Sequence, residues 1–161
     1  MSKAIPSNIA NRPPQHQVFL NFRGDELRGK FISHLETALK REDINVFIDN
    51  DLGMGKDLGI FLETIEKSRI AIAVISSLYT ESSWCLDELA KIKECVEKGT
   101  LEVFPLFFKV PVETVEDLTG TFGDNFRKLA KMDKHKLKRK KWRKALKFVT
   151  KRKGEKTDET R

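Results

Sequence analysis

The stretch Ile70-Ala71-Ile72-Ala73-Val74-Ile75 decides the fold, because it is apolar at every position. A strand that is apolar on both faces is typical of the centre of a parallel sheet whose two faces are covered by helices. Ser76 and Ser77 end this run, and a helical pattern begins a few residues later. The stretch therefore predicts a parallel α/β sheet with this strand at its centre.

Strand-like and helical patterns alternate on both sides of that run. The strand-like runs are apolar and lie at residues 17–22, 44–48 and 101–108, and the helical patterns lie at 27–41, 58–67 and after residue 82. This alternation predicts helices on both faces of the sheet. We expect the flavodoxin-like three-layer α/β fold, with about five strands in the order 2-1-3-4-5. Pro105 lacks a backbone donor, so we expect its strand to lie near an edge or to be locally broken.

The net charge of +7 is distributed unevenly along the 161 residues. Residues 1–126 carry 14 Lys/Arg and 20 Asp/Glu, whereas residues 127–153 carry 15 Lys/Arg and a single acid, Asp133. We expect one folded domain over residues 16–153, which ends in a basic C-terminal helix over 127–153, and a frayed tail over 154–161. Residues 1–15 are polar and interrupted by prolines, which predicts a disordered N-terminal segment.

Several classes of function are excluded by what the sequence lacks. No apolar run is long enough to form a transmembrane segment, and the N-terminus has no secretory signal. Two cysteines are too few for a disulfide framework, which indicates a reducing, intracellular compartment. The first strand is followed by Arg23-Gly24-Asp25-Glu26 rather than by a glycine-rich phosphate loop. The three histidines are scattered along the chain, so we expect no metal site and no bound cofactor.

The helix after the central strand carries the strongest candidate for chemistry. It begins with Ser82-Ser83-Trp84-Cys85-Leu86-Asp87-Glu88-Leu89, and its Trp84 and Glu88 are four residues apart on one side. Two interpretations are open: a Trp wall beside a fixed carboxylate, or an amphipathic helix with a solvated Glu. Functional loops of parallel α/β sheets gather at the carboxyl ends of the strands. Residues 23–26, 49–57 and 76–88 fall at those ends, which favours the first interpretation.

One carboxylate is sufficient for one kind of bond cleavage. Breaking an N-glycosidic bond passes through an oxocarbenium-like state at the sugar carbon. When the leaving group is already cationic, as nicotinamide is in NAD, it departs neutral and needs no general acid. An ionised Glu88 could then stabilise the developing positive charge. Trp84 could line the site beside the nicotinamide ring or the ribose, and Arg23 could reach the pyrophosphate.

Several motifs support this hypothesis when they are taken together. They are Phe19-Leu20-Asn21-Phe22-Arg23-Gly24, Phe31-Ile32-Ser33-His34-Leu35, Ser83-Trp84-Cys85-Leu86-Asp87-Glu88-Leu89 and Thr119-Gly120-Thr121-Phe122-Gly123. The set resembles the Toll/interleukin-1 receptor (TIR) domains of plant intracellular immune receptors and of short TIR-only proteins. The likeness runs from about His16 to about Val149, which is nearly the whole folded part.

The resemblance implies a self-associating NAD hydrolase whose products, which could include cyclic ADP-ribose variants, act as signals in plant defence. NAD is then a substrate, and other TIR domains are the expected partners. The family's catalytic Glu falls on Glu88, and its substrate-binding positions fall on Arg23, Gly24, Arg28, Ser76 and Trp84. Its gating loop falls on residues 49–58, which include Asp49, Gly55 and Lys56. The Ser-His pair through which family members associate falls on Ser33 and His34. No switch domain or receptor repeats follow, so we expect a TIR-only protein.

The sequence departs from the family pattern in the loops around the expected pocket. Asp25-Glu26-Leu27-Arg28 replaces the usual acid-Asp-Thr-Arg run, and Met54 precedes Gly55 where the family usually has Arg. Lys56 could supply the charge that is lost at Met54. These changes leave Glu88 intact but keep a second hypothesis open, in which the protein is a catalytically weak adaptor that binds other TIR domains.

A third hypothesis concerns the basic segment 127–153. Its cations could bind nucleic acid or an anionic surface with steep salt dependence, or they could form only a solvated lysine-rich face. The lysine run contains no interleaved aromatic before Trp142, so base stacking is not indicated. The same run could serve as a nuclear signal, so we expect a cytoplasmic protein that could also enter the nucleus.

Overall fold

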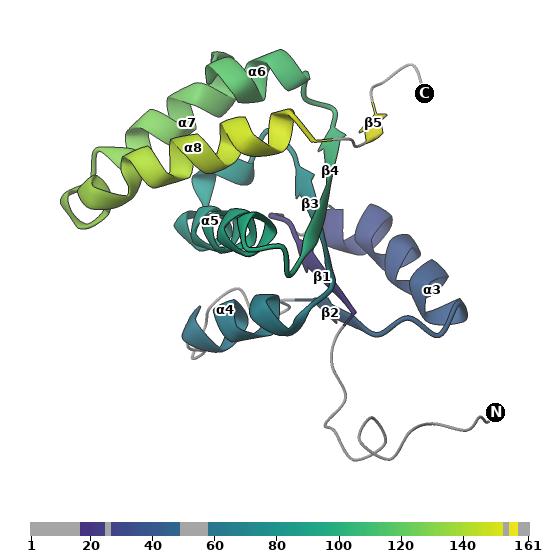
Figure 1. Ribbon diagram of the computed structural model, residues 1–161. Helices are drawn as coiled ribbons and strands as arrows, with labels where there is room; N and C mark the ends of the chain where they lie inside the picture. The colour runs from purple at the N-terminus through teal and green to yellow at the C-terminus, as the bar shows by residue number, and fades with distance from the viewer. Residues whose placement is uncertain (1–16, 25–26, 49–57, 153–154, 158–161) are drawn as a thin grey trace.

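The computed structural model describes residues 17–24, 27–48, 58–152 and 155–157. Five strands in this part of the chain form one parallel sheet in the order β2-β1-β3-β4-β5 (Figure 1). They are β1 (Val18–Asn21), β2 (Val46–Ile48), β3 (Ile70–Ile75), β4 (Glu102–Phe108) and β5 (Glu155–Thr157). The predicted flavodoxin-like fold and its strand order are therefore confirmed.

Strand β3 lies at the centre of the sheet, as its apolar run predicts. It pairs with β1 from Ile70 to Ala73 and with β4 along its whole length. On the other side of β4, strand β5 pairs with Leu106, Phe107 and Phe108. Pro105 lies just outside that paired stretch, in agreement with the expected position near an edge.

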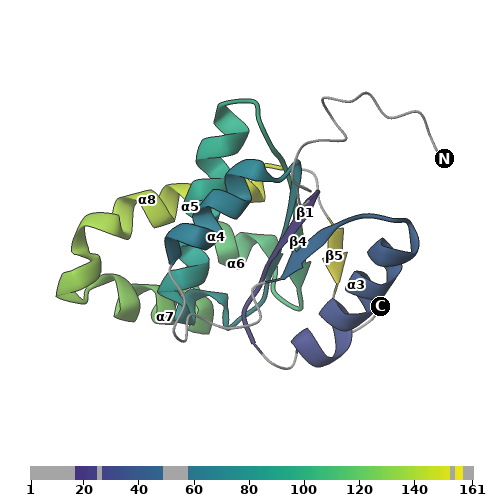
Figure 2. The same ribbon diagram turned by 90° about the horizontal axis from the view of Figure 1, so that it is seen from below.

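Helices cover both faces of the sheet, and the view in Figure 2 shows the layers from a second direction. A π-helix, η1 (Arg28–Ile32), continues into α3 (Ser33–Arg41) on one face. The helices on the other side are α4 (Leu58–Lys67), α5 (Ser83–Glu97), α6 (Val112–Asp117), α7 (Gly120–Ala130) and α8 (Arg139–Thr150). Two short 3-10 helices are η2 (Tyr79–Glu81) and η3 (Asp133–Lys138).

The side chains of β1 alternate between two hydrophobic cores. Val18 and Leu20 belong to the cluster beneath η1 and α3, whereas Phe19 belongs to the larger cluster formed with α5 and α8. Successive side chains of a strand point to opposite faces, so Asn21 lies on the same face as Phe19. The pleat of β1 thus directs a polar side chain toward α5.

The basic segment 127–153 is not the single helix that we expected. Helix α7 ends at Ala130, η3 follows, and α8 begins at Arg139. The chain reverses there, so that α7 and α8 run antiparallel (Figure 1). The reversal buries Trp142 completely and brings its Nε1 to 2.9 Å from a carboxylate oxygen of Asp87 on α5. Burial of this large aromatic ring accounts for the break, since one continuous helix would carry Trp142 away from the core.

Two further differences from expectation lie near the ends of the folded part. The helix expected over 27–41 opens with the π-helical turn of η1. Within the tail over 154–161, residues Glu155–Thr157 form β5.

No helix among the described residues is both long enough and apolar enough to cross a bilayer. The N-terminal segment 1–15 lies outside the described residues.

Candidate active site

Glu88 is held in the second turn of α5, close to the carboxyl end of β1. The helix begins at Ser83 because the side chain of Ser82 caps it, and the Ser82 Oγ accepts a 3.0 Å hydrogen bond from the backbone N–H of Cys85. Only 2% of Glu88 is exposed. The alternative of a solvated carboxylate on an amphipathic surface is therefore excluded.

Both carboxylate oxygens of Glu88 accept hydrogen bonds from neutral donors. The side-chain amide of Asn21 donates to Oε1 at 2.9 Å, and the indole Nε1–H of Trp84 donates to Oε2 at 3.0 Å. The first bond joins residues 67 positions apart in the chain, and the second joins neighbours on one helical face. Neither donor carries a charge, so these two bonds orient the carboxylate through hydrogen bonding alone.

Asn21 was not among the residues that we selected from the sequence. It ends β1 and is 1% exposed, and its Oδ1 accepts a hydrogen bond from the hydroxyl of the fully buried Tyr79. Because a hydroxyl donor faces Oδ1, the amide NH₂ of Asn21 must face Glu88. Burial raises the pKa of Tyr79 well above its ordinary value, so the hydroxyl keeps its proton. The sequence feature that could have identified Asn21 is a polar residue at the carboxyl end of an apolar strand.

Trp84 is anchored by the neighbouring helix as well as by Glu88. Its ring packs edge-on against Phe61 of α4, with ring centroids 5.4 Å apart, and Phe61 in turn contacts Phe47 of β2. Trp84 is half-buried and donates its single polar hydrogen to Glu88. The indole therefore orients the carboxylate in addition to lining the space beside it.

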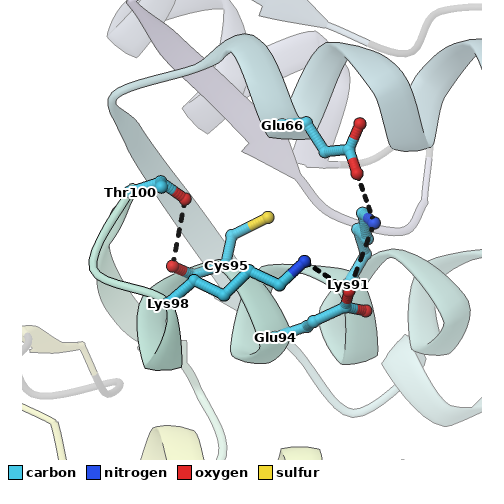
Figure 3. Close-up of polar contacts among 6 residues, drawn as sticks. All are labelled: Glu66, Lys91, Glu94, Cys95, Lys98 and Thr100. Atoms are coloured by element: carbon cyan, nitrogen blue, oxygen red, sulfur yellow. Dashed lines mark hydrogen bonds and ion pairs between the residues drawn. The ribbon is translucent and has the colours of Figure 1, made fainter.

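One ion pair joins α4 to α5 farther along the same two helices, and a second lies within α5. Lys91 of α5 lies 2.6 Å from a carboxylate oxygen of Glu66 on α4 and 3.5 Å from one of Glu94 (Figure 3). The hydrogen bond from Lys91 lowers the pKa of Glu66 and raises that of Lys91. Cys95 carries a buried thiol on the core side of this segment, and burial raises its pKa. These contacts hold in register the two helices that supply Phe61, Trp84 and Glu88.

A small pocket, with a volume of about 20 Å³, opens beside the carboxylate. It brings together three of the predicted site residues, Arg23, Trp84 and Glu88. The remaining lining residues are Leu20, Phe22, Ser82 and Cys85. Arg23 follows the carboxyl end of β1, so a cation and a buried carboxylate line one cavity.

Other predicted residues lie elsewhere. Gly24 and Ser76 line a second pocket, of about 180 Å³, which also includes Arg23 but not Glu88. The guanidinium of Arg28 lies over the ring of Phe22, 5.1 Å from its centroid, and Arg28 is not among the described residues that line either pocket. A role of these residues in substrate binding stays a prediction.

The predicted association residues lie away from this pocket. Ser33 and His34 are exposed at the start of α3, on the opposite face of the sheet from α5. The gating-loop residues Asp49, Gly55 and Lys56 lie outside the described residues. On α8, Lys140, Lys141, Arg143 and Lys144 are exposed or partly exposed, and binding of nucleic acid or of an anionic surface there stays a prediction.

Comparison with known proteins gives a consistent family relationship. Residues 15–161 match the family model described as TIR domain. The chain is 50% identical over 149 residues to Disease resistance protein RPS4 of Arabidopsis thaliana, and 57% identical over 136 residues to Disease resistance-like protein CSA1 of the same plant. These alignments cover 92% and 84% of this chain but only 12% and 11% of the two relatives.

The fold also matches solved structures. The TIR domains of the activated Roq1 resistosome, which directly recognises the pathogen effector XopQ, superpose on this chain with a TM-score of 0.77 and 37% sequence identity. The match covers 88% of this chain and 87% of the Roq1 chain. The similarity thus extends from sequence motifs to the whole arrangement of strands and helices.

Proposed function

The chain belongs to the TIR domain family, and on that basis we propose that it hydrolyses NAD to nicotinamide and ADP-ribose at Glu88. The observation that carries the proposal is the buried carboxylate, with one oxygen bound by Asn21 and the other by Trp84, in a pocket that also contains Arg23. A carboxylate that is fixed in advance can stabilise a developing positive charge without reorganising during the reaction.

Cleavage of the bond between ribose and nicotinamide requires little from the protein beyond the negative charge of Glu88. The bond between ribose C1′ and the pyridinium nitrogen breaks, and its electron pair neutralises the departing nicotinamide. Glu88 stabilises the oxocarbenium-like ribose that remains. A water molecule then attacks C1′ and loses a proton as the new C–O bond forms. Capture of C1′ by a nucleophile within the ADP-ribose itself would give a cyclic product instead.

Arg23 and Trp84 have separate roles in this proposal. The guanidinium of Arg23 is suited to the substrate pyrophosphate, because its planar set of donors matches phosphate oxygens. Trp84 keeps Oε2 of Glu88 in place, and its ring, anchored by Phe61, forms a rigid wall of the pocket. Asn21 has the same orienting role for Oε1.

We also propose that the protein acts in plant defence signalling through association with other TIR domains. RPS4 and CSA1 are named as disease resistance proteins, and the Roq1 TIR domains were solved in an activated resistosome. The exposed positions of Ser33 and His34 on α3 leave this surface open to a second copy. Assembly could then bring residues of a neighbouring copy to the Glu88 pocket.

An adaptor without turnover is the second candidate. The cavity beside Glu88 has a volume of about 20 Å³, far below the range of roughly 300–1,000 Å³ for ligand sites. This size favours an adaptor if assembly does not enlarge the site. The adaptor would use the exposed start of α3 and would need no free access to Glu88.

The experiment that distinguishes the hydrolase from the adaptor is nicotinamide release from NAD as a function of protein concentration. A working hydrolase that needs assembly gives a specific activity that rises with concentration, and a double variant of Ser33→Ala and His34→Ala lowers that rise. The matched control is Thr37→Ala on the same exposed surface of α3. No nicotinamide at any concentration, together with measurable association with another TIR domain, would select the adaptor.

A further inference from the structure

The second pocket has the composition of a ligand site, although the proposed hydrolysis does not use it. It lies at the carboxyl ends of β1, β3 and β4, next to the start of η1, and has a volume of about 180 Å³. The residues that characterise it are Arg23, Lys30, Phe31, Ser76, Phe108 and Lys109. Ligands of parallel α/β proteins bind at the carboxyl ends of the strands, and this cavity can hold a phosphate or part of a ring while the rest of the ligand lies over its open side.

A buried hydroxyl in this pocket has no hydrogen-bond partner among the described residues. It belongs to Ser76, which directly follows β3, is 8% exposed and lines the pocket. Buried polar groups are nearly always satisfied, so an unsatisfied hydroxyl on a cavity wall points to an external partner. A hydroxyl can donate a hydrogen bond to an anionic oxygen.

The ionisable side chains on the pocket are cations. Among the described residues that line it, these are Arg23, Lys30 and Lys109, and the two lysines are exposed at the rim. Lys109 has a left-handed backbone conformation with φ of 55°, and its Nζ lies 5.4 Å from the ring centroid of Phe108. The charge of the rim and the free hydroxyl on the wall both favour an anion.

One wall of the pocket is aromatic. The rings of Phe31 and Phe108 lie 5.7 Å apart, tilted by 46°, and both side chains are half-buried. They come from η1 and from the end of β4, so two different elements build the wall. An aromatic wall beside cations suits a ligand that carries both an aromatic ring and a phosphate.

We propose that this pocket binds a nucleoside monophosphate. The phosphate lies among Lys30, Lys109 and Arg23 and accepts a hydrogen bond from the Ser76 hydroxyl, while the base packs against Phe108 and Phe31. The site is separate from the Glu88 pocket and shares only Arg23 with it. Binding does not require NAD turnover, so the proposal holds or fails independently of the proposed hydrolase.

The test is a titration of the full 161-residue chain, carrying Glu88→Gln, with AMP, adenosine or inorganic phosphate. NMR chemical-shift changes of the backbone amides of Ser77 and Lys109 report binding in this pocket. Changes at Trp84 and Cys85 report binding in the Glu88 pocket. We expect AMP to shift the first pair, adenosine to bind roughly tenfold more weakly because it lacks the phosphate contacts, and inorganic phosphate to compete with AMP.

Two variants and one control make the assignment specific. Lys109→Asn removes the cation and keeps a residue that tolerates the left-handed backbone, so it should weaken AMP binding roughly tenfold. Ser76→Ala should weaken binding several-fold without lowering the unfolding temperature, because the hydroxyl has no protein partner to lose. Lys141→Asn on α8 should leave binding unchanged. AMP shifts confined to Trp84 and Cys85, or equal affinity in Lys109→Asn and Lys141→Asn, would overturn the proposal.

Discussion

The side-chain amide of Asn21 donates a 2.9 Å hydrogen bond to Oε1 of Glu88, joining the end of β1 to the second turn of α5. Both residues are buried, at 1% and 2% exposure. A buried hydrogen bond to a charged acceptor contributes more than one between neutral groups, because water cannot replace it. Asn21 is therefore a positioning residue for the proposed reaction.

Replacing Asn21 should lower catalysis more than it lowers binding. In Asn21→Ala the carboxylate loses the neutral donor to its Oε1, so we expect kcat to fall by about 10- to 100-fold with a smaller change in KM. The free energy of unfolding should fall by about 2 kcal/mol. Steady-state kinetics and urea denaturation measure these effects. Asn125→Ala on α7 is the control, and equal kcat in the two variants would remove Asn21 from the mechanism.

Trp84 offers a variant that separates hydrogen bonding from packing. Trp84→Phe removes the Nε1–H donor to Oε2 but keeps an aromatic ring against Phe61. We expect kcat to fall about tenfold, while the unfolding temperature changes little. Trp84→Leu, which also removes the aromatic contact, should lose both activity and stability. An unchanged kcat in Trp84→Phe would show that the indole N–H does not orient the carboxylate.

Tyr79 can be observed directly, since it is the single tyrosine of the chain. Burial, together with nearby Cys85 and Glu88, raises its pKa well above the ordinary value of about 10. The folded protein should therefore show little tyrosinate absorbance at a pH where the denatured protein ionises fully.

The same shift has a consequence for stability. A raised folded-state pKa favours the native state below about pH 10, and that contribution is lost as the pH rises beyond the ordinary value. The free energy of unfolding of the wild type should fall above pH 10 more steeply than that of Tyr79→Phe. Ionisation of Tyr79 in the folded protein near pH 10 would contradict its burial.

His135 should make the stability depend on pH at the acidic side. Burial, with nearby Lys134 and Lys138, lowers its pKa, and its ring lies 5.1 Å from that of Trp142. A lowered folded-state pKa stabilises the fold above the ordinary value of about 6.5, and that stability is lost as the pH falls. Denaturation between pH 7 and 5 should show a smaller slope in His135→Gln than in the wild type. Equal slopes would mean that His135 protonates as freely in the folded state as in the unfolded state.

The sequence was sufficient for the fold because its strongest signals are local. The apolar run of β3 specifies a central strand, and the Ser82 cap with the apolar stripe of α5 specifies the helix that carries Glu88. The alternation of such elements then restricts the topology to a few parallel arrangements. Pairing of Trp84 with Glu88 also follows from helical spacing alone.

The parts of the site that the sequence did not reveal depend on contacts between distant segments. Asn21 reaches Glu88 across 67 positions, and Tyr79 reaches Asn21 across 58. The break between α7 and α8 follows from the burial of Trp142 rather than from any Pro or Gly between them. Likewise, the sequence did not show that Ser76 lines a pocket separate from the one that contains Glu88, with Arg23 on both.

Nicotinamide release from NAD by the wild type and by Glu88→Gln, at matched high protein concentration, tests the central claim most directly. Both proteins should fold with the same unfolding temperature within a few degrees. We expect steady nicotinamide release from the wild type and none above background from Glu88→Gln, because an amide cannot supply the negative charge that the oxocarbenium-like state requires. Equal release by the two proteins would contradict a role for the Glu88 carboxylate in the reaction.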